Sequence, residues 1–255
     1  MKYAIHTPCQ RLRRYVRHLV ISETDSAGQY PIFPDTGLVM GFQYAGKLAY
    51  LHDDGAHPLA TAGITGLLDG YRLFQNVAAT GTVLVVFRET GLAAFVRRPV
   101  HELFDLSLSL DQLFSRQAIC DTQERLAEAR DDRARLAIVE EFLLGELRVF
   151  EPDPLVAGAL SAIYDSGGTI RIRELAAELH ISQSPLEKRF RQYVGASPKK
   201  FAGIVRIRKM ITALERGRGH LDAMDYLDVY YDQAHFINDF KRFTSMTPEE
   251  FLRRG

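Results

Sequence analysis

Three side chains that could do chemistry, Asp232, His235 and Asp239, fall within about two helical turns of the segment YYDQAHFINDFKRF. His235 and Asp239 are four residues apart, so in a helix they would lie on one face, as two ligands of a metal ion do. The same groups could instead exchange protons or read the hydrogen-bonding edge of another molecule. A plainer interpretation is that Asp232 caps a helix and His235 lies at the surface.

A second copy of the pattern decides between these interpretations. The segment FRQYVGASPKKF aligns without gaps on FKRFTSMTPEEF, fifty residues later, so that aromatic, basic and Ser/Thr-Pro positions coincide. At the same offset Pro185 stands for His235 and Arg189 for Asp239. Because the repeat supplies no third and fourth ligand, we predict that no metal binds here.

The first copy has the pattern of a helix-turn-helix unit. Apolar spacing over residues 172–179 predicts one helix, and Ser182 is a favoured N-cap for a second. That second helix would bury Leu186, Phe190 and Val194, which lie at i, i+4 and i+8.

The second copy carries a polar surface of the same kind. Asp232 takes the N-cap position of Ser182, and Phe236, Phe240 and Phe243 form the buried stripe. The other faces carry Gln233, Ala234, His235, Asn238, Lys241 and Arg242. This polar, weakly basic surface suits the major groove of DNA, whose base edges pair with amide, imidazole and basic side chains.

A linking helix is predicted between the two units, from Ser197 as N-cap and Pro198 at its first position to Arg216. Its length of about 28 Å would hold two reading helices roughly one turn of DNA, about 34 Å, apart. The formal net charge is zero, but positive charge is concentrated between Ser184 and Arg218. Candidates for phosphate contact, or for a merely solvated face, are Lys199, Lys200, Arg206, Arg208 and Lys209.

The N-terminal half has a different pattern. Short apolar runs broken by glycine, proline and aspartate predict a mostly antiparallel sheet or small barrel up to about residue 115. Residues 122–149 predict one or two amphipathic helices, which either cover the sheet or form a subunit interface. The predicted fold is α+β with two domains: a β-rich, cupin-like sheet or barrel with flanking helices over residues 1–150, and an all-α domain over residues 151–255, beginning at EPDP.

Composition excludes several classes of protein. No apolar stretch is long enough for a signal peptide or a membrane span, so we expect a soluble cytoplasmic protein with no membrane partner. Cys9 and Cys120 are too few for a disulfide framework. His52 and His57 lack the HxH pair and following glutamate of a cupin metal site, and we interpret them as ordinary loop histidines.

The C-terminal hundred residues closely resemble the AraC/XylS family of bacterial transcription regulators, through LAAELHISQSPLEKRFRQYVGASPKKF and YYDQAHFINDFKRFTSMTPEEF. The resemblance implies two DNA-binding helix-turn-helix units joined by a linking helix. It places base-reading positions at Ser184, Glu187 and Lys188 in the first unit, and at Gln233, Ala234, His235 and Asn238 in the second. The full predicted DNA-binding set adds Ser182, Gln183, Arg191, Lys199, Lys200, Arg206, Lys241 and Arg242.

The second unit departs from the family pattern. Asp225 and Val229 stand where the family usually has a small residue and a turn glycine, and Asn238 stands where it often has arginine. Valine tolerates positive φ poorly, so this turn would be strained or rearranged. We therefore expect the first unit to carry more of the affinity for DNA.

The segment FRETGLAAFVRRPVHELFDLSLSLDQLF is similar to a β-rich domain attached to a subset of these regulators, which often binds a small effector or mediates dimerisation. We predict a transcription regulator that binds double-stranded DNA sequence-specifically and has neither a cofactor nor catalytic activity. A small-molecule effector and a homodimer are possible partners that the sequence leaves open. Two alternatives stay open. One is a metal-dependent β-barrel enzyme with a DNA-binding tail, and the other is an interaction module whose DNA-binding domain has decayed.

Overall fold

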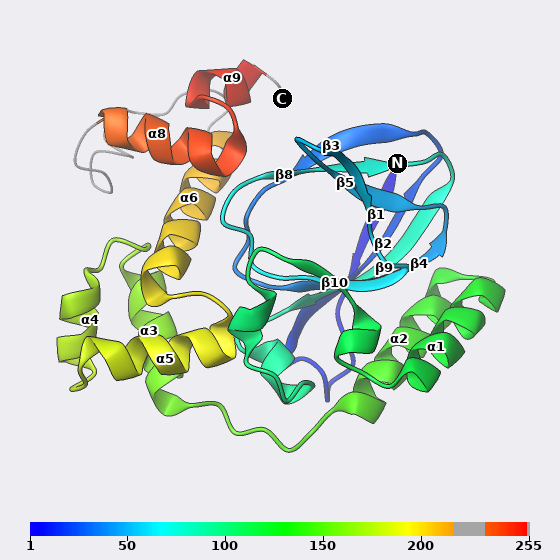
Figure 1. Ribbon diagram of the computed structural model, residues 1–255, viewed down its shortest axis with the longest axis horizontal. Helices are drawn as coiled ribbons and strands as arrows, with labels where there is room; N and C mark the ends of the chain where they lie inside the picture. The colour runs from blue at the N-terminus through cyan, green and yellow to red at the C-terminus, as the bar shows by residue number, and fades with distance from the viewer. Residues whose placement is uncertain (217–232, 254–255) are drawn as a thin grey trace.

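Two antiparallel sheets form the N-terminal region of the computed structural model, which describes residues 1–216 and 233–253 (Figure 1). The larger sheet has the strand order β1-β2-β9-β4-β7-β10, and the smaller has the order β3-β8-β5-β6. The strands are β1 (Lys2–His6), β2 (Val16–Thr24), β3 (Gly28–Ile32), β4 (Val39–Ala45), β5 (Leu48–His52), β6 (Gly55–Pro58), β7 (Ala62–Thr65), β8 (Arg72–Asn76), β9 (Thr80–Phe87) and β10 (Ser107–Ser109). The predicted β-rich region is therefore confirmed.

Large apolar side chains occupy one face of the larger sheet, because successive residues of a strand point to opposite faces. Leu19 and Phe42 are fully buried on the face that α1 (Arg116–Glu128) and α2 (Asp132–Glu146) cover (Figure 1). The ring of Phe42 meets that of Phe142 in α2 edge to face, with 5.4 Å between centroids. The apolar side of the predicted amphipathic segment thus packs on the protein's own sheet.

Helices make up the chain from Pro154 to the end of the described residues, apart from their connections. Asp153 caps α3 (Pro154–Asp165) by accepting a hydrogen bond from the Leu155 N–H at 2.9 Å. The predicted boundary at residues 151–154 therefore coincides with a helix start. Within the described residues, no helix has the length and apolar character that a membrane span requires.

The predicted duplication is visible at the level of single contacts. The helices are α4 (Ile172–Glu178), α5 (Gln183–Val194), α6 (Pro198–Arg216), α8 (Gln233–Thr244) and α9 (Pro248–Arg253). The rings of Phe190 and Phe201 lie 5.6 Å apart, as do those of Phe240 and Phe251 fifty residues later. Asp225, Val229 and Asp232, on which the predicted departure of the second unit and its cap depend, lie outside the described residues.

The hydrophobic core is continuous between the sheet region and the first helix-turn-helix unit. Val100 in the short helix η2 (Val100–Leu103) belongs to the same cluster of buried residues as Phe190 and Val194 of α5. A separate cluster joins the later part of α6 to Phe240 and its neighbours in α8. The first unit is therefore fixed to the barrel that the two sheets form in the N-terminal region. The division at residues 150 and 151 into two independently folding domains stays a prediction.

Candidate nucleic-acid interface and barrel cavity

The first predicted reading helix, α5, turns a polar face outward. Its exposed or half-exposed residues include all those predicted from the sequence: Ser182, Gln183, Ser184, Glu187, Lys188 and Arg191. Ser182 occupies the N-cap position as expected, but its hydroxyl makes no capping hydrogen bond. Arg191 pairs with Glu187 of the preceding turn at 3.8 Å. Lys188, the other basic residue predicted on this helix, is exposed and forms no ion pair with a carboxylate of the described residues.

The second predicted reading helix, α8, has the same design. Phe236, Phe240 and Phe243 are buried, as predicted, and Gln233, Ala234 and His235 lie in the first turn. Asn238, Lys241 and Arg242 are exposed. Asp239, one of the two residues first considered as metal ligands, accepts a hydrogen bond from Arg206 at 2.9 Å and lies 3.7 Å from Arg242. Its carboxylate is thus already engaged by two cations.

The predicted phosphate-binding residues of α6 divide into two groups. Lys199 is exposed. Lys200 donates a hydrogen bond to Asp69 of the barrel at 2.7 Å, and its ammonium lies over the Phe104 ring, 4.4 Å from the centroid. Arg206 is turned toward Asp239, with 21% of its side chain exposed. Lys200 and Arg206 therefore hold parts of the protein together in this arrangement, and either would have to leave its carboxylate to bind phosphate.

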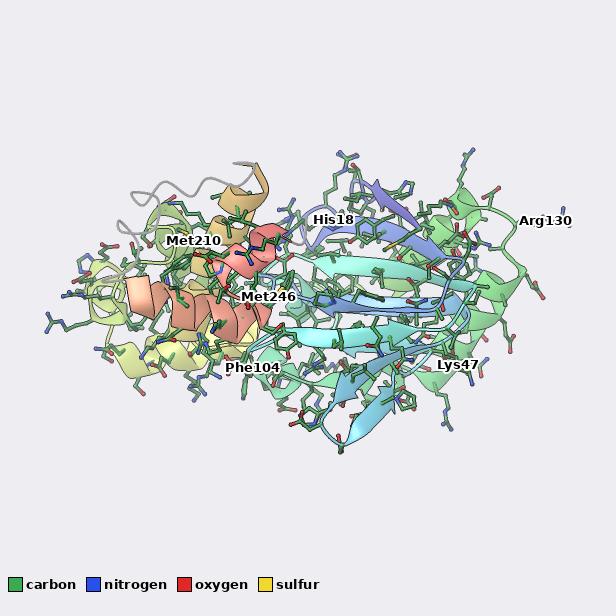
Figure 2. The ribbon with its side chains drawn as sticks, turned by 90° about the horizontal axis from the view of Figure 1, so that it is seen from above. His18, Lys47, Phe104, Arg130, Met210 and Met246 are labelled. Atoms are coloured by element: carbon green, nitrogen blue, oxygen red, sulfur yellow. The ribbon has the colours of Figure 1, made fainter. Side chains whose placement is uncertain are left out.

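The two reading helices lie near opposite ends of α6 and run in roughly the same direction (Figures 1 and 2). Their N-terminal ends point away from the sheets (Figure 1). The linking helix spans nineteen residues, as predicted, which gives about 28 Å of rigid rod. This geometry agrees with two helices presented to successive major grooves.

A basic hollow next to α5 was not predicted from the sequence. Arg97, Arg98 and Arg148 line it together with Gln192 and Tyr193 at the C-terminal end of α5. Gln192 lies one turn beyond Lys188 on the same side of the helix. In the sequence, Arg97 and Arg98 look like an ordinary charged loop, because nothing in the local pattern brings them near a helix ninety residues later.

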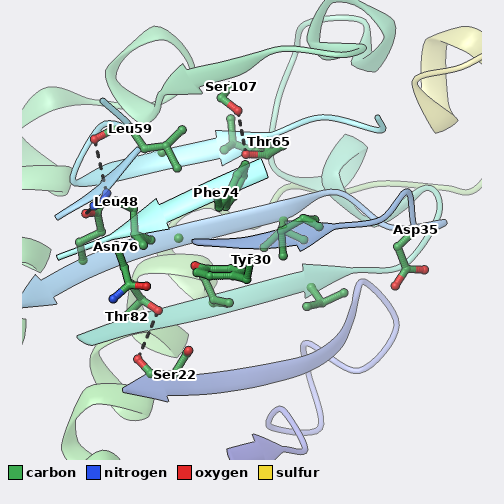
Figure 3. Close-up of a pocket in the computed structure, with 18 of the residues that line it drawn as sticks. Ser22, Tyr30, Asp35, Leu48, Leu59, Thr65, Phe74, Asn76, Thr82 and Ser107 are labelled. Carbon is green, nitrogen blue, oxygen red and sulfur yellow. Dashed lines mark hydrogen bonds between the residues drawn. The ribbon is translucent and has the colours of Figure 1, made fainter. Parts of the chain in front are cut away.

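Small and polar side chains line the inner face of the larger sheet, opposite the face that α1 and α2 cover. Ser22, Thr82 and Gln43 form one cross-strand row, and Gly41 pairs directly with Gly63 in the next. The two sheets enclose a cavity of about 530 Å³ (Figure 3). None of these residues was in the predicted site. The sequence signal that could have indicated them is the alternation in TVLVVF, where Thr82 and Leu84 face the cavity and Val83 and Val85 face the helix-covered core.

The smaller sheet supplies an aromatic wall to this cavity. Tyr30 and Phe74 are cross-strand partners, and their rings meet at 6.3 Å in an edge-to-face arrangement. Burial raises the pKa of the Tyr30 phenol, which keeps it protonated at neutral pH. Asn76, farther along the same strand, donates hydrogen bonds to the Ser26 and Val77 carbonyls, both at 2.8 Å. Its amide is therefore used within the protein.

Charged groups gather at the end of the cavity nearest α6. Asp35 lies at that end, well apart from Thr82 and Asn76 (Figure 3). It is 3.4 Å from Arg17 and 3.9 Å from Arg208 of α6. Burial alone would raise the pKa of Asp35, but Arg208 and Arg17 outweigh it and hold the pKa below its usual range. Burial, aided by Arg17, lowers the pKa of the neighbouring His18 imidazole and so favours its neutral form.

The histidines considered for a cupin-type metal site lie elsewhere, on the hairpin of β5 and β6. His52 and His57 flank Asp54 at 3.2 Å and 2.7 Å, and His57 stacks on Tyr50. Across the described ranges 1–216 and 233–253, no group of three or more His, Cys, Asp or Glu side chains is arranged to hold a metal ion.

Comparisons with known proteins agree with this architecture. A family model described as a helix-turn-helix domain matches residues 175–254, and a domain of unknown function, DUF6597, matches residues 4–109. A crystal structure of an apo variant of ToxT from Vibrio cholerae has a TM-score of 0.50 at 12% identity, covering 92% of this chain and 96% of that one. ToxT solved with a bound unsaturated fatty acid has a TM-score of 0.46 at 11% identity, covering 92% and 94%. No curated protein matches the chain at a significant level.

The match to the helix-turn-helix model and the polar face that α5 turns outward define a DNA-binding transcription regulator of the helix-turn-helix class. The model covers residues 175–254, where the sequence resemblance implied such a domain, and DUF6597 precedes it. None of the comparisons supports the alternative of a metal-dependent β-barrel enzyme.

Proposed function

We propose that the protein regulates transcription by sequence-specific binding of both helix-turn-helix units to DNA, without catalytic activity, and that a small molecule in the barrel cavity modulates this binding. The observation that carries the proposal is the duplication. Helices α5 and α8 each bury an apolar stripe and turn polar residues outward, at opposite ends of one linking helix. A DNA partner implies the cytoplasm as the site of action.

Base discrimination is assigned to the outward residues of the reading helices. In α5 these are Ser184, Glu187 and Lys188, and in α8 Asn238 is exposed. The same role is proposed for Gln233, Ala234 and His235, which lie in the first turn of α8. Phosphate contacts, which make affinity depend steeply on salt, are assigned first to the exposed cations Lys199, Lys241 and Arg242. Lys200 and Arg206 join this set only if binding frees them from Asp69 and Asp239.

The cavity supports the effector part of the proposal. Its volume lies within the range of pockets that enclose drug-sized ligands. Phe33 and Arg208 line its rim, and both belong to contacts between the barrel and the helical region. A ligand that fills the cavity would therefore touch groups on which the position of the helical region depends.

Selection of duplexes from a random DNA pool tests the proposal. We expect an asymmetric site with two segments about one helical turn apart, because the two units differ in sequence. The length and symmetry of the selected site also report whether a dimer binds, since the homodimer stays a prediction. Equal affinity for all duplexes at physiological salt would count decisively against sequence-specific regulation.

A further inference from the structure

We infer that the barrel cavity binds an uncharged, largely apolar molecule with one hydroxyl or carbonyl group, and that it discriminates against carboxylates. The inference rests on the proposed effector role of the cavity and specifies the chemical class of the ligand. It follows from the charges, the shape and the polar groups of the lining.

The charges of the lining are already paired. Among the described residues that line the cavity, Asp35 and Arg208 carry the charged side chains, and they lie 3.9 Å from each other. Met1 also lines the cavity but is 85% exposed, so its charge stays in contact with water. Asp35 also holds Arg17. A further cation near the cavity, Arg72, donates a hydrogen bond to the lining residue Ser107 and is bound to Asp105 at 3.1 Å. A ligand carboxylate would therefore compete with Asp35 for Arg208 or remain unpaired in a space from which water is displaced.

An unpaired charge in such a space is costly. Removing an ion from water is unfavourable even after the protein relaxes, unless a partner of opposite charge is available. The His18 imidazole supplies no positive charge at neutral pH, because its pKa is lowered. A neutral ligand meets no such cost. Its contact with the apolar side chains of Leu84, Val86 and Phe74 would remove apolar surface from water and so favour binding.

The cavity has space over the middle of the larger sheet and hydroxyl groups at the end far from Asp35 (Figure 3). Gly41 and Gly63, which pair across β4 and β7, leave the middle of the larger sheet without side chains. Beyond them, Ser22 and Thr82 face each other across β2 and β9. The Thr82 hydroxyl donates a long hydrogen bond to the Ser22 carbonyl at 3.5 Å and can still accept (Figure 3). The Ser22 hydroxyl can both donate and accept, so together the two can bind a ligand hydroxyl or carbonyl.

The neighbouring polar groups are occupied by the protein itself. Gln43 donates to the Ala60 carbonyl at 2.8 Å and accepts from the Leu48 N–H at 2.9 Å. Thr65 and Ser107 hydrogen-bond to each other at 3.0 Å. One polar group on the ligand, placed near Ser22 and Thr82, therefore suits the lining better than several.

Calorimetric titration of the full-length protein at pH 7.5 with decan-1-ol and with decanoate tests the inference, because the two probes differ in charge and hardly in size. We expect saturable binding of decan-1-ol, at least about tenfold tighter than that of decanoate. 2-Naphthol and 2-naphthoate form a second, planar pair for which the same order is expected.

Two variants locate the binding site. Leu84→Trp fills the middle of the cavity and is expected to abolish binding. Thr82→Val keeps the volume, removes the hydroxyl and is expected to weaken decan-1-ol severalfold, so it remains informative if the larger substitution prevents folding. Wild-type affinity for decan-1-ol in a folded Leu84→Trp protein would overturn the inference.

Two further results would also overturn it. One is binding of decanoate as tight as that of decan-1-ol, especially if Arg208→Gln abolishes it. The other is the absence of saturable binding by both neutral probes. Binding of the selected DNA duplex, measured in parallel, separates the outcomes: a protein that binds its duplex but prefers carboxylates refutes the ligand class and leaves the proposed regulation of transcription standing.

Discussion

The ring of Phe33, at the rim of the barrel cavity, lies 5.8 Å from the ring of Phe251 in α9. Gly70 approaches the same region: a Cβ atom added there would lie 3.1 Å from the Arg242 carbonyl oxygen at the end of α8. The second helix-turn-helix unit therefore rests on the cavity rim through few contacts, whereas the first unit shares the core of the barrel.

Phe33→Ala should loosen the second unit without unfolding the barrel. Loss of the aromatic contact is expected to lower the local stability of α8 and α9 by about 1–2 kcal/mol. Hydrogen exchange should accelerate in these two helices and stay unchanged in β2 and β9. Leu106→Ala, at an exposed apolar side chain of the barrel, is the control. Unchanged exchange in α8 and α9 would show that the contact contributes nothing to docking.

Asp69→Asn should free Lys200 and strengthen DNA binding. The Lys200 ammonium loses its ion pair with Asp69 and becomes available to phosphate, so we expect a gain of about two- to fivefold and a salt dependence steeper by about one ion. Asp54→Asn removes the same charge on the β5–β6 hairpin and is the matched control. An equal gain in the control would mean that general charge, and not Lys200, causes the effect.

Arg206→Met should destabilise the second unit rather than remove a phosphate contact. It leaves the half-buried Asp239 without its closest cation, which we expect to cost about 2–3 kcal/mol of unfolding free energy. Thermal unfolding measures this loss, and the salt dependence of DNA affinity should stay as in the wild type. Lys199→Met should leave thermal stability unchanged and make the salt dependence of DNA affinity weaker. A stable Arg206→Met protein with a weaker salt dependence would restore Arg206 to the DNA-binding set.

Acid should weaken the contact of Asp35 with Arg17 and Arg208. The folded-state pKa of Asp35 lies below its unfolded value of 3.8, so its charged form stabilises the folded protein. This stabilisation is complete above about pH 4 and is lost as the pH falls through the lower folded-state pKa. Asp35→Asn should therefore lower stability at neutral pH, by about 1 kcal/mol, and flatten its decline below pH 4 in denaturant titrations. A decline as steep as in the wild type would exclude Asp35 as its source.

Lys188→Ala should weaken binding to the selected duplex more than Asn238→Ala does. Lys188 brings a positive charge to the proposed DNA-binding face of α5, whereas Asn238 brings none to α8. We expect a loss of about tenfold for Lys188→Ala and a smaller one for Asn238→Ala, measured by fluorescence anisotropy at one salt concentration. An equal loss would refute the larger role of the first unit.

The helical half of the protein was predictable because its signals are local. The apolar spacing of Leu186, Phe190 and Val194 specifies a buried helix face within twelve residues, and the same pattern recurs fifty residues later. Even the left-handed residue that ends each reading helix recurs, as Gly195 with φ of 96° and Ser245 with φ of 62°.

The cavity and the contacts between barrel and helices were not predictable in this way. Ser22 meets Thr82 only because β2 pairs with β9 in one particular register. Lys200 meets Asp69 across 131 residues of chain, so a cation that looked free for DNA is paired with a carboxylate of the same protein. A single sequence contains no local signal for such pairs, because they depend on how distant elements dock.

The facing pair Gly41 and Gly63 has an evolutionary consequence. Glycine and alanine codons differ by one base, and a methyl group at position 41 would press on Leu84 at 3.2 Å. Under the proposed function, one point mutation can thus change the ligand preference of the cavity while leaving the DNA sequence that the reading helices bind unchanged. The two specificities could then diverge separately in evolution.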